Sequence, residues 1–285
     1  MDQRELRTVA VGLLVSLVLW NLPFGGVLLY PFKILATWLH ELSHALIMVV
    51  TGVGVERVVI FRDTSGLAFP AGEANAVANA FIAAAGYMGT PLWGALLLAA
   101  TPTARAARIA MLVLAGLLLV SALTIVEAPP QDPWFGRWTV IVMAGVFAAA
   151  AVFVPGRWRL VTAHFIAVQS CVNALLDIRV LLRPSQMVGG RPTTASDAHN
   201  MAYATFGTHD AWAVWTWAAI WLLWSLAVLY VALRLSGSQA ARIAAASAAP
   251  TELPRGESDR GARRRSPATA PGETAPSARA DIGGP

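Results

Sequence analysis

Long apolar runs are the feature that most constrains how this 285-residue chain can fold. A helix needs about 20 apolar residues to cross the hydrocarbon core of a bilayer. Runs of this kind lie near residues 8–30, 31–51, 77–100, 107–127, 137–154, 159–183 and 211–234. The chain is 13% charged, whereas an ordinary soluble domain carries about 25% charged residues. The sequence therefore predicts an all-α, polytopic membrane protein with about six to seven transmembrane helices.

A polar stretch interrupts this pattern between the second and third runs. Residues 55–61 are rich in valine and isoleucine, as is typical of a strand, and residues 62–66 contain the aspartate, serine and glycine of a turn. Residues 67–69 are suited to return as a second strand. The sequence thus predicts a short β-hairpin next to the membrane.

The composition changes abruptly near Ser236, where alanine, proline, serine, glycine and arginine replace the large apolar residues. Such a segment buries too little apolar surface to offset the entropy lost on ordering it. We therefore expect two regions, a transmembrane domain at residues 1–235 and a disordered basic tail at residues 236–285.

Charge and cysteine content exclude several kinds of site. The net charge is +5, but the arginines are scattered between apolar runs or gathered in the tail, which disfavours nucleic-acid binding. Cys171 is the single cysteine, so the chain has neither an internal disulfide nor a C-x-x-C metal motif. Any metal site must use histidine, aspartate, glutamate or asparagine side chains.

The most informative motif is His40-Glu41-Leu-Ser-His44, an H-E-x-x-H pattern inside an apolar run. Residues four apart share one face of a helix, so the two imidazoles can hold one zinc ion. Glu41 lies about a quarter-turn from His40, where its carboxylate can take a proton from water and return it to a leaving amine. Each ionisable residue in a span costs about 3 kcal/mol, which favours a functional metal site over a chance match.

A catalytic zinc ion usually has three protein ligands, so a third must come from elsewhere in the chain. Gln169, Asn173 and Asp177 follow each other at four-residue steps and form one polar stripe along the run at 159–183. By residue count, His44 and Asp177 both lie about 10 Å below the same membrane face. This favours Asp177 as the ligand, with a hydrogen-bonded seam between helices as the alternative role of the stripe.

The loop after this run holds a second candidate pair, Asp197 and His199. Either residue can bind a metal, relay a proton or cap the helix that follows. The sequence leaves open whether Asp177 or the pair of Asp197 and His199 completes the zinc site.

Small residues recur over residues 83–94, at spacings of three to five residues around Gly86, Gly89 and Gly94. Such a pattern suits close contact with a neighbouring helix. A role as the wall of a pocket is the alternative.

Together these motifs resemble the site-2 protease family of intramembrane zinc metallopeptidases, and within it the short bacterial B-type members without a PDZ domain. The resemblance is carried by the H-E-x-x-H pattern in a span, by residues 51–57 leading into the hairpin, by residues 84–86, and by the stretch from Asn173 to Asp177. The chain has Tyr87 after Gly86, where the family commonly has proline, and it lacks the proline and glycine of the usual aspartate motif.

The resemblance implies that His40, His44 and Asp177 bind one zinc ion per chain, that Glu41 is the general base, and that Asn173 contacts the substrate carbonyl or oxyanion. It also implies an endopeptidase that cuts a peptide bond in or near a transmembrane segment of another membrane protein. The hairpin would hold the unwound substrate by strand addition. The expected location is the bacterial plasma membrane, with several spans.

A second hypothesis is a membrane protein that binds zinc without proteolysis, as a scaffold, a sensor or a degenerate protease. Glu41 favours the enzyme, because a binding-only site needs the histidines and has no use for the carboxylate. The expected partners are a membrane-protein substrate and the lipid bilayer, without nucleic acid, and the sequence specifies no oligomeric state.

Overall fold

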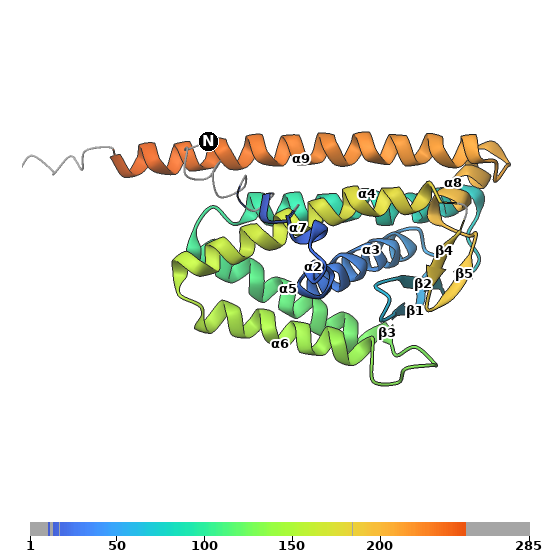
Figure 1. The fold of residues 1–285 in the computed structure, drawn as a ribbon, viewed down its shortest axis with the longest axis horizontal. Helices are drawn as coiled ribbons and strands as arrows, with labels where there is room; N and C mark the ends of the chain where they lie inside the picture. The colour runs from blue at the N-terminus through green and yellow to red at the C-terminus, as the bar shows by residue number, and fades with distance from the viewer. Residues whose placement is uncertain (1–10, 12–13, 17, 184, 249–285) are drawn as a thin grey trace, which may run out of the picture. The chain divides into compact units, whose positions relative to one another are not determined.

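Helices make up most of the chain in the computed structural model, which describes residues 11, 14–16, 18–183 and 185–248 (Figure 1). The helices are α2 (Gly25–Leu28), α3 (Tyr30–Val50), α4 (Ala76–Ala100), α5 (Ala104–Thr124), α6 (Arg137–Phe153), α7 (Gly156–Leu181), α8 (Asp197–Phe206) and α9 (Ala211–Ala248). The strands are β1 (Val55–Ile60), β2 (Gly66–Pro70), β3 (Val126–Glu127), β4 (Gln186–Val188) and β5 (Arg191–Thr193).

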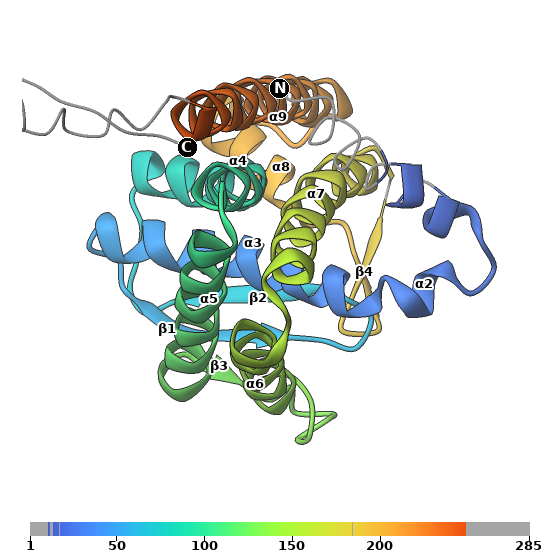
Figure 2. The ribbon, with the colours of Figure 1, turned by 90° about the vertical axis from the view of Figure 1, so that its left-hand side faces the viewer.

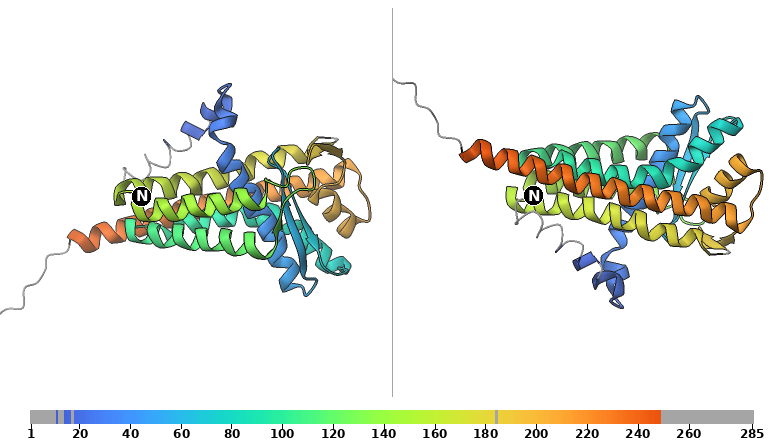
Figure 3. Two further views of the ribbon diagram at one scale, coloured as in Figure 1. Left: turned by 90° about the horizontal axis from the view of Figure 1, so that it is seen from below. Right: turned by 90° about the horizontal axis from the view of Figure 1, so that it is seen from above.

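Five helices are long and apolar enough to cross a membrane. They are α3, α4, α5, α7 and the part of α9 from Ala211 to Ser236. The α6 helix is also apolar but has only 17 residues. Figures 2 and 3 show α4, α5, α6, α7 and α9 extended in one general direction, while α3 crosses them, and the sheets and α8 lie at one end. These features confirm a mostly helical fold with several candidate spans.

The expected first span, at residues 8–30, is not one continuous helix where the structure describes it. Helical residues 18–21 are followed by a turn at residues 22–24 and then by the four-residue helix α2. Pro23 has no backbone N–H and clashes with the preceding turn, so it interrupts a helix. The interruption lets α3 start afresh at Tyr30, with a proline in its first turn. Residues 8–10, 12, 13 and 17 of the expected span lie outside the described residues.

The strands form two small sheets. β1 and β2 pair antiparallel from Val55↔Pro70 to Ile60↔Gly66, with an irregularity after Val55, and this confirms the predicted hairpin. The first sheet has the order β2-β1-β3, in which β3 pairs parallel to β1. β4 and β5 form a second antiparallel pair between α7 and α8. Neither β3 nor the β4–β5 hairpin was expected from the sequence.

Two apolar clusters hold these elements together. The first joins α3, α5, α6 and β1, and in it Trp38 is 1% exposed while its Nε1 donates to Ser121 Oγ at 2.9 Å. The second joins α4, α7, α8 and α9 around the fully buried Trp221. Figure 2 shows α4 and α7 between α9 on one side and α3 and α5 on the other. The α3 helix is therefore fixed on several sides.

The last helix runs beyond the expected domain boundary at residue 235. α9 continues to Ala248, and contacts divide the chain into a first unit at Met1–Ala246 and a second at Ser247–Pro285. Residues 249–285 of the expected disordered tail lie outside the described residues.

Candidate metal centre

The two histidines of the H-E-x-x-H motif lie one turn apart on α3. This helix opens with a proline in its first turn and then consists largely of buried apolar residues, which fix it in the core. The rings of His40 and His44 stand 4.8 Å apart between centroids. His44 and Glu41 are each 6% exposed. The motif thus forms the arrangement that its spacing predicts, in a largely buried setting.

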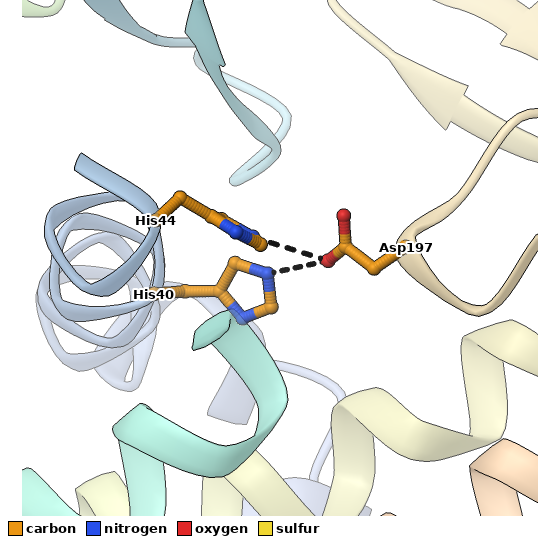
Figure 4. Close-up of side chains that lie close together, drawn as sticks. All are labelled: His40, His44 and Asp197. Atoms are coloured by element: carbon orange, nitrogen blue, oxygen red, sulfur yellow. Dashed lines mark hydrogen bonds and ion pairs between the residues drawn. The ribbon is translucent and has the colours of Figure 1, made fainter. Parts of the chain in front are cut away.

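A third side chain meets both imidazoles from the far end of the chain. Asp197 Oδ2 lies 3.0 Å from His40 Nε2 and 3.2 Å from His44 Nε2 (Figure 4). One ligand atom from each residue falls within 4.8 Å of the others. Tetrahedral zinc with bonds of about 2.1 Å separates its ligand atoms by about 3.4 Å. The two nitrogens and one oxygen therefore fit a zinc ion by donor type and by spacing.

Asp197 is the first residue of α8, and Ser196 caps that helix by accepting a hydrogen bond from His199 N. Burial alone would raise the pKa of the Asp197 carboxyl, but His44 and His40, through charge and hydrogen bonds, hold this pKa below its ordinary value. The N-terminus of a helix also stabilises a negative charge. The side chain is therefore an anion, which is the form that binds a metal.

The second nitrogen of His44 is fixed by α4. Its Nδ1 lies 2.6 Å from the carbonyl oxygen of Ile82, to which it donates as Nδ1–H. This contact selects the tautomer whose Nε2 lone pair is free for a metal, and it sets the plane of the ring. The fold therefore supplies both the ligand atom and its orientation.

Two glycines let the neighbouring elements approach the motif. A Cβ at Gly86 would lie 2.5 Å from His44 Nε2 and closer still to His40 Nε2. A Cβ at Gly66, on β2, would lie 2.7 Å from Glu41 Oε1, and the Ala68 backbone N–H donates to the same carboxylate. The metal ligands thus touch α4, while the carboxylate beside them touches the hairpin.

A cavity of about 1000 Å³ opens at this site. Its walls come from α3, β2, the start of α4, the end of α7, the β4–β5 hairpin and α8. Apart from the three grouped residues, its polar lining includes Glu41, Tyr87, Asp177, Asp63, Arg191 and His209. One accessible cavity therefore contains two imidazoles and a carboxylate that can hold a cation. It also contains a further carboxylate that can move a proton.

The family model described as Peptidase M50B-like matches residues 9–232. The chain belongs to the Peptidase M50B-like family. This confirms the resemblance to the site-2 proteases, and the matched region contains the H-E-x-x-H motif, the hairpin and Asp197. No curated protein and no solved structure matches the chain. Membership implies an intramembrane metallopeptidase, and with five apolar helices it indicates an integral membrane protein.

The structure places the two carboxylates considered as third ligand differently. Asp197 contacts both imidazoles, as described above. Asp177, on α7, is exposed and lines the same cavity, but it lies outside the one three-residue metal group found among the described residues. His199 also lies outside that group, and its Nδ1 is 2.7 Å from Ser196 Oγ in the cap of α8. Of the alternatives left open by the sequence, Asp197 is the one that the fold brings to the histidines.

The other residues of the α7 stripe lie between helices. Asn173 is 3% exposed, and its Nδ2 donates to the Phe32 carbonyl of α3 at 3.2 Å. Gln169 Oε1 accepts a hydrogen bond from Ser16 Oγ at 2.7 Å. Neither amide belongs to the residues that line the cavity. This part of the stripe is the hydrogen-bonded seam that the sequence offered as the alternative role.

Three contacts of the site have little signal in the sequence. The Ile82 carbonyl that orients His44 belongs to the backbone, so no residue type marks it. Gly86 belongs to the run of small residues expected to favour close helix contact, and here the contacted group is an imidazole. Tyr87 follows Gly86, and the sequence marks it only because the family commonly has proline at that position.

Proposed function

We propose that the chain is a zinc-dependent intramembrane endopeptidase that hydrolyses a peptide bond in or near a transmembrane segment of another membrane protein. The observation that carries the proposal is the meeting of His40, His44 and Asp197 beside Glu41 in one cavity. Membership of the Peptidase M50B-like family supports it. The proposed setting is the plasma membrane of a bacterium, with one zinc ion per chain.

We assign the third ligand position to Asp197 rather than to Asp177. The assignment is supported by the distances of 3.0 and 3.2 Å from Asp197 Oδ2 to the two Nε2 atoms. Three protein ligands leave one tetrahedral position open, as catalytic zinc sites require. Asp177 then stays in the cavity as a carboxylate beside the site.

When bound, zinc supplies a Lewis acid that polarises a carbonyl group and lowers the pKa of water. Glu41 takes a proton from the attacking water and passes it to the nitrogen of the leaving amine. Its carboxylate is held against β2 by the hydrogen bond from Ala68 and by the missing side chain at Gly66. The general base therefore has a fixed position between the metal ligands and the hairpin.

The same hairpin is suited to hold an extended substrate. Among the described residues, β2 is an edge strand paired only with β1, and Gly66, Leu67, Ala68 and Pro70 all line the cavity. An unwound peptide added to this edge gains main-chain hydrogen bonds that a helix in lipid would otherwise keep within itself. It would lie next to Glu41.

The test is to incubate purified wild-type protein with bacterial membranes whose own copy of the gene is deleted, and to identify new protein N-termini by mass spectrometry. We expect new termini in or near transmembrane segments. Glu41→Gln should keep its zinc and lower the rate of their formation by about 10²- to 10⁴-fold. Glu56→Gln is the matched control, because Glu56 is an exposed glutamate paired with Arg57 on β1.

The second hypothesis, a zinc-binding membrane protein without proteolysis, predicts a different result. Wild type and Glu41→Gln would then bind zinc equally and yield the same set of N-termini. That result would overturn the proposed peptidase activity and leave the metal site in place.

A further inference from the structure

Tyr87 is an aromatic side chain in contact with one of the metal ligands. Its ring stands 4.8 Å from the ring of His40, with an angle of 89° between the two planes. It follows Gly86, the residue whose missing side chain lets α4 touch both imidazoles. It also lines the cavity. The phenol is therefore part of the wall that faces the proposed reaction.

The ring is held in place from its other side by α9. Tyr87 stacks on Trp221 with 4.9 Å between centroids and 3° between planes. Tyr87 is 8% exposed and Trp221 is fully buried. A ring packed between an imidazole and a parallel indole cannot swing away without disturbing the core. The direction of its hydroxyl is thus set by the fold.

The hydroxyl of Tyr87 has no hydrogen-bond partner among the residues that the structure describes. Buried tyrosines usually find such a partner. Two of the other three tyrosines have one, since Tyr30 donates to the Arg62 carbonyl and Tyr230 accepts from Arg234. The third, Tyr203, is exposed on α8. The contact between the Tyr87 and His40 rings and the place of Tyr87 in the cavity lining put the phenol beside the metal ligands.

A donor of this kind accelerates peptide hydrolysis. When water adds to the carbonyl carbon, the electron pair of the C=O bond moves to the oxygen, and donors already aimed at that oxygen stabilise the charge. The resemblance implied this role for Asn173, but its amide donates to the Phe32 carbonyl outside the cavity lining. The donor position for the oxyanion is therefore open to another side chain.

We propose that Tyr87 is a catalytic residue whose hydroxyl donates a hydrogen bond to the oxyanion of the substrate carbonyl. The proposal rests on the proposed peptidase function. Tyr87 keeps its proton throughout, because Glu41 carries the proton from water to the leaving amine. The hydrogen bond strengthens as charge develops on the oxygen, so it acts on the transition state more than on the bound substrate.

The test compares Tyr87→Phe with Tyr230→Phe. Both changes remove one hydroxyl, but Tyr230 lies on the exposed surface of α9. Tyr87→Phe should lower kcat by about 10²-fold or more, with KM within about twofold, on a peptide that spans the first cleavage site found with native membranes. The zinc content and the melting temperature should match the wild type. Tyr230→Phe should change none of these values.

A binding measurement separates this proposal from the proposed function. Acetohydroxamate carries an anionic oxygen to the same site, and its binding to the cobalt-substituted protein is followed by visible absorption. Tyr87→Phe should raise its Kd by about tenfold or more, the loss of one hydrogen bond to a charged group. This binding measurement can be made even when no substrate is cleaved.

Two results would overturn the assignment of Tyr87. One is a Tyr87→Phe protein with wild-type kcat and wild-type hydroxamate affinity. The other is a protein that loses zinc together with activity, because that loss assigns the phenol a structural role in the metal site. A third result separates the two proposals. If the wild type cleaves nothing but Tyr87→Phe still weakens hydroxamate binding, the peptidase function is contradicted, while the hydrogen bond from Tyr87 to an oxyanion at the metal site is supported.

Discussion

Gly86 of α4 and His40 of α3 lie so close that a methyl group at position 86 would overlap the imidazole. The contact lets α4 reach the metal ligands with its backbone, and the Ile82 carbonyl of the same helix orients His44. A glycine that suits helix packing in the sequence therefore forms part of the metal centre.

Replacing Gly86 by alanine should displace both imidazoles. Overpacking of this kind costs about 1–3 kcal/mol, and here it falls on the metal ligands, so we expect zinc affinity to drop by about fivefold or more. Competition with a chromogenic chelator measures the change. Gly116→Ala is the control, because a Cβ at Gly116 on α5 would meet nothing within 4 Å. Equal zinc affinities for the two variants would contradict the role of Gly86.

The β4–β5 hairpin should help to place Asp197. Its turn is tied to the β1–β2 turn, since Gly190 N donates to Asp63 Oδ2 at 2.8 Å and Gly189 N donates to Ser65 Oγ at 3.0 Å. Asp197 follows β5 by only a few residues. Asp63→Ala should therefore weaken zinc binding by a factor of about 2 to 10, the effect of about 0.5–1.5 kcal/mol.

The control for Asp63→Ala is Glu73→Ala, which removes an exposed carboxylate from the loop before α4. The same chelator competition applies to both variants. If Asp63→Ala leaves the zinc affinity unchanged, the hydrogen bond between the two turns is not needed to hold Asp197 in place.

Removal of zinc should lower the melting temperature of the detergent-solubilised protein. The ion would join α3 to α8 and bind only the folded chain, so it stabilises the fold by about 2.7 kcal/mol when free zinc is 100 times Kd. Asp197→Ala should melt at the same temperature with and without a chelator. A wild-type melting temperature that does not respond to zinc or chelator would contradict a site that links the two helices.

The parts of the site set by local spacing could be predicted from the sequence. His40 and His44 share a helix face because they are four residues apart, and the hairpin follows from β-branched residues around a turn. The short strands β3, β4 and β5 could not be predicted, since two or three residues carry little pattern. β3 pairs with the distant strand β1, and the turn between β4 and β5 is hydrogen-bonded to Ser65, which is also far away in the chain.

The third ligand, Asp177 or Asp197, could not be assigned from the sequence alone. Residue counts give the depth of Asp177 along its helix, but they leave open which carboxylate comes within bonding distance of the imidazoles. Asp197 reaches them because the loop after α7 folds back over the cavity and starts α8 there. That path depends on tertiary packing, which spacing in the sequence does not encode.

The most direct test is the zinc content of purified wild-type protein, His44→Ala, Asp197→Ala and Asp177→Ala by elemental analysis. We predict one zinc ion per chain in the wild type and in Asp177→Ala, and its loss in His44→Ala and Asp197→Ala. Zinc retained in Asp197→Ala but lost in Asp177→Ala would contradict the assigned ligand set and move the third ligand to α7.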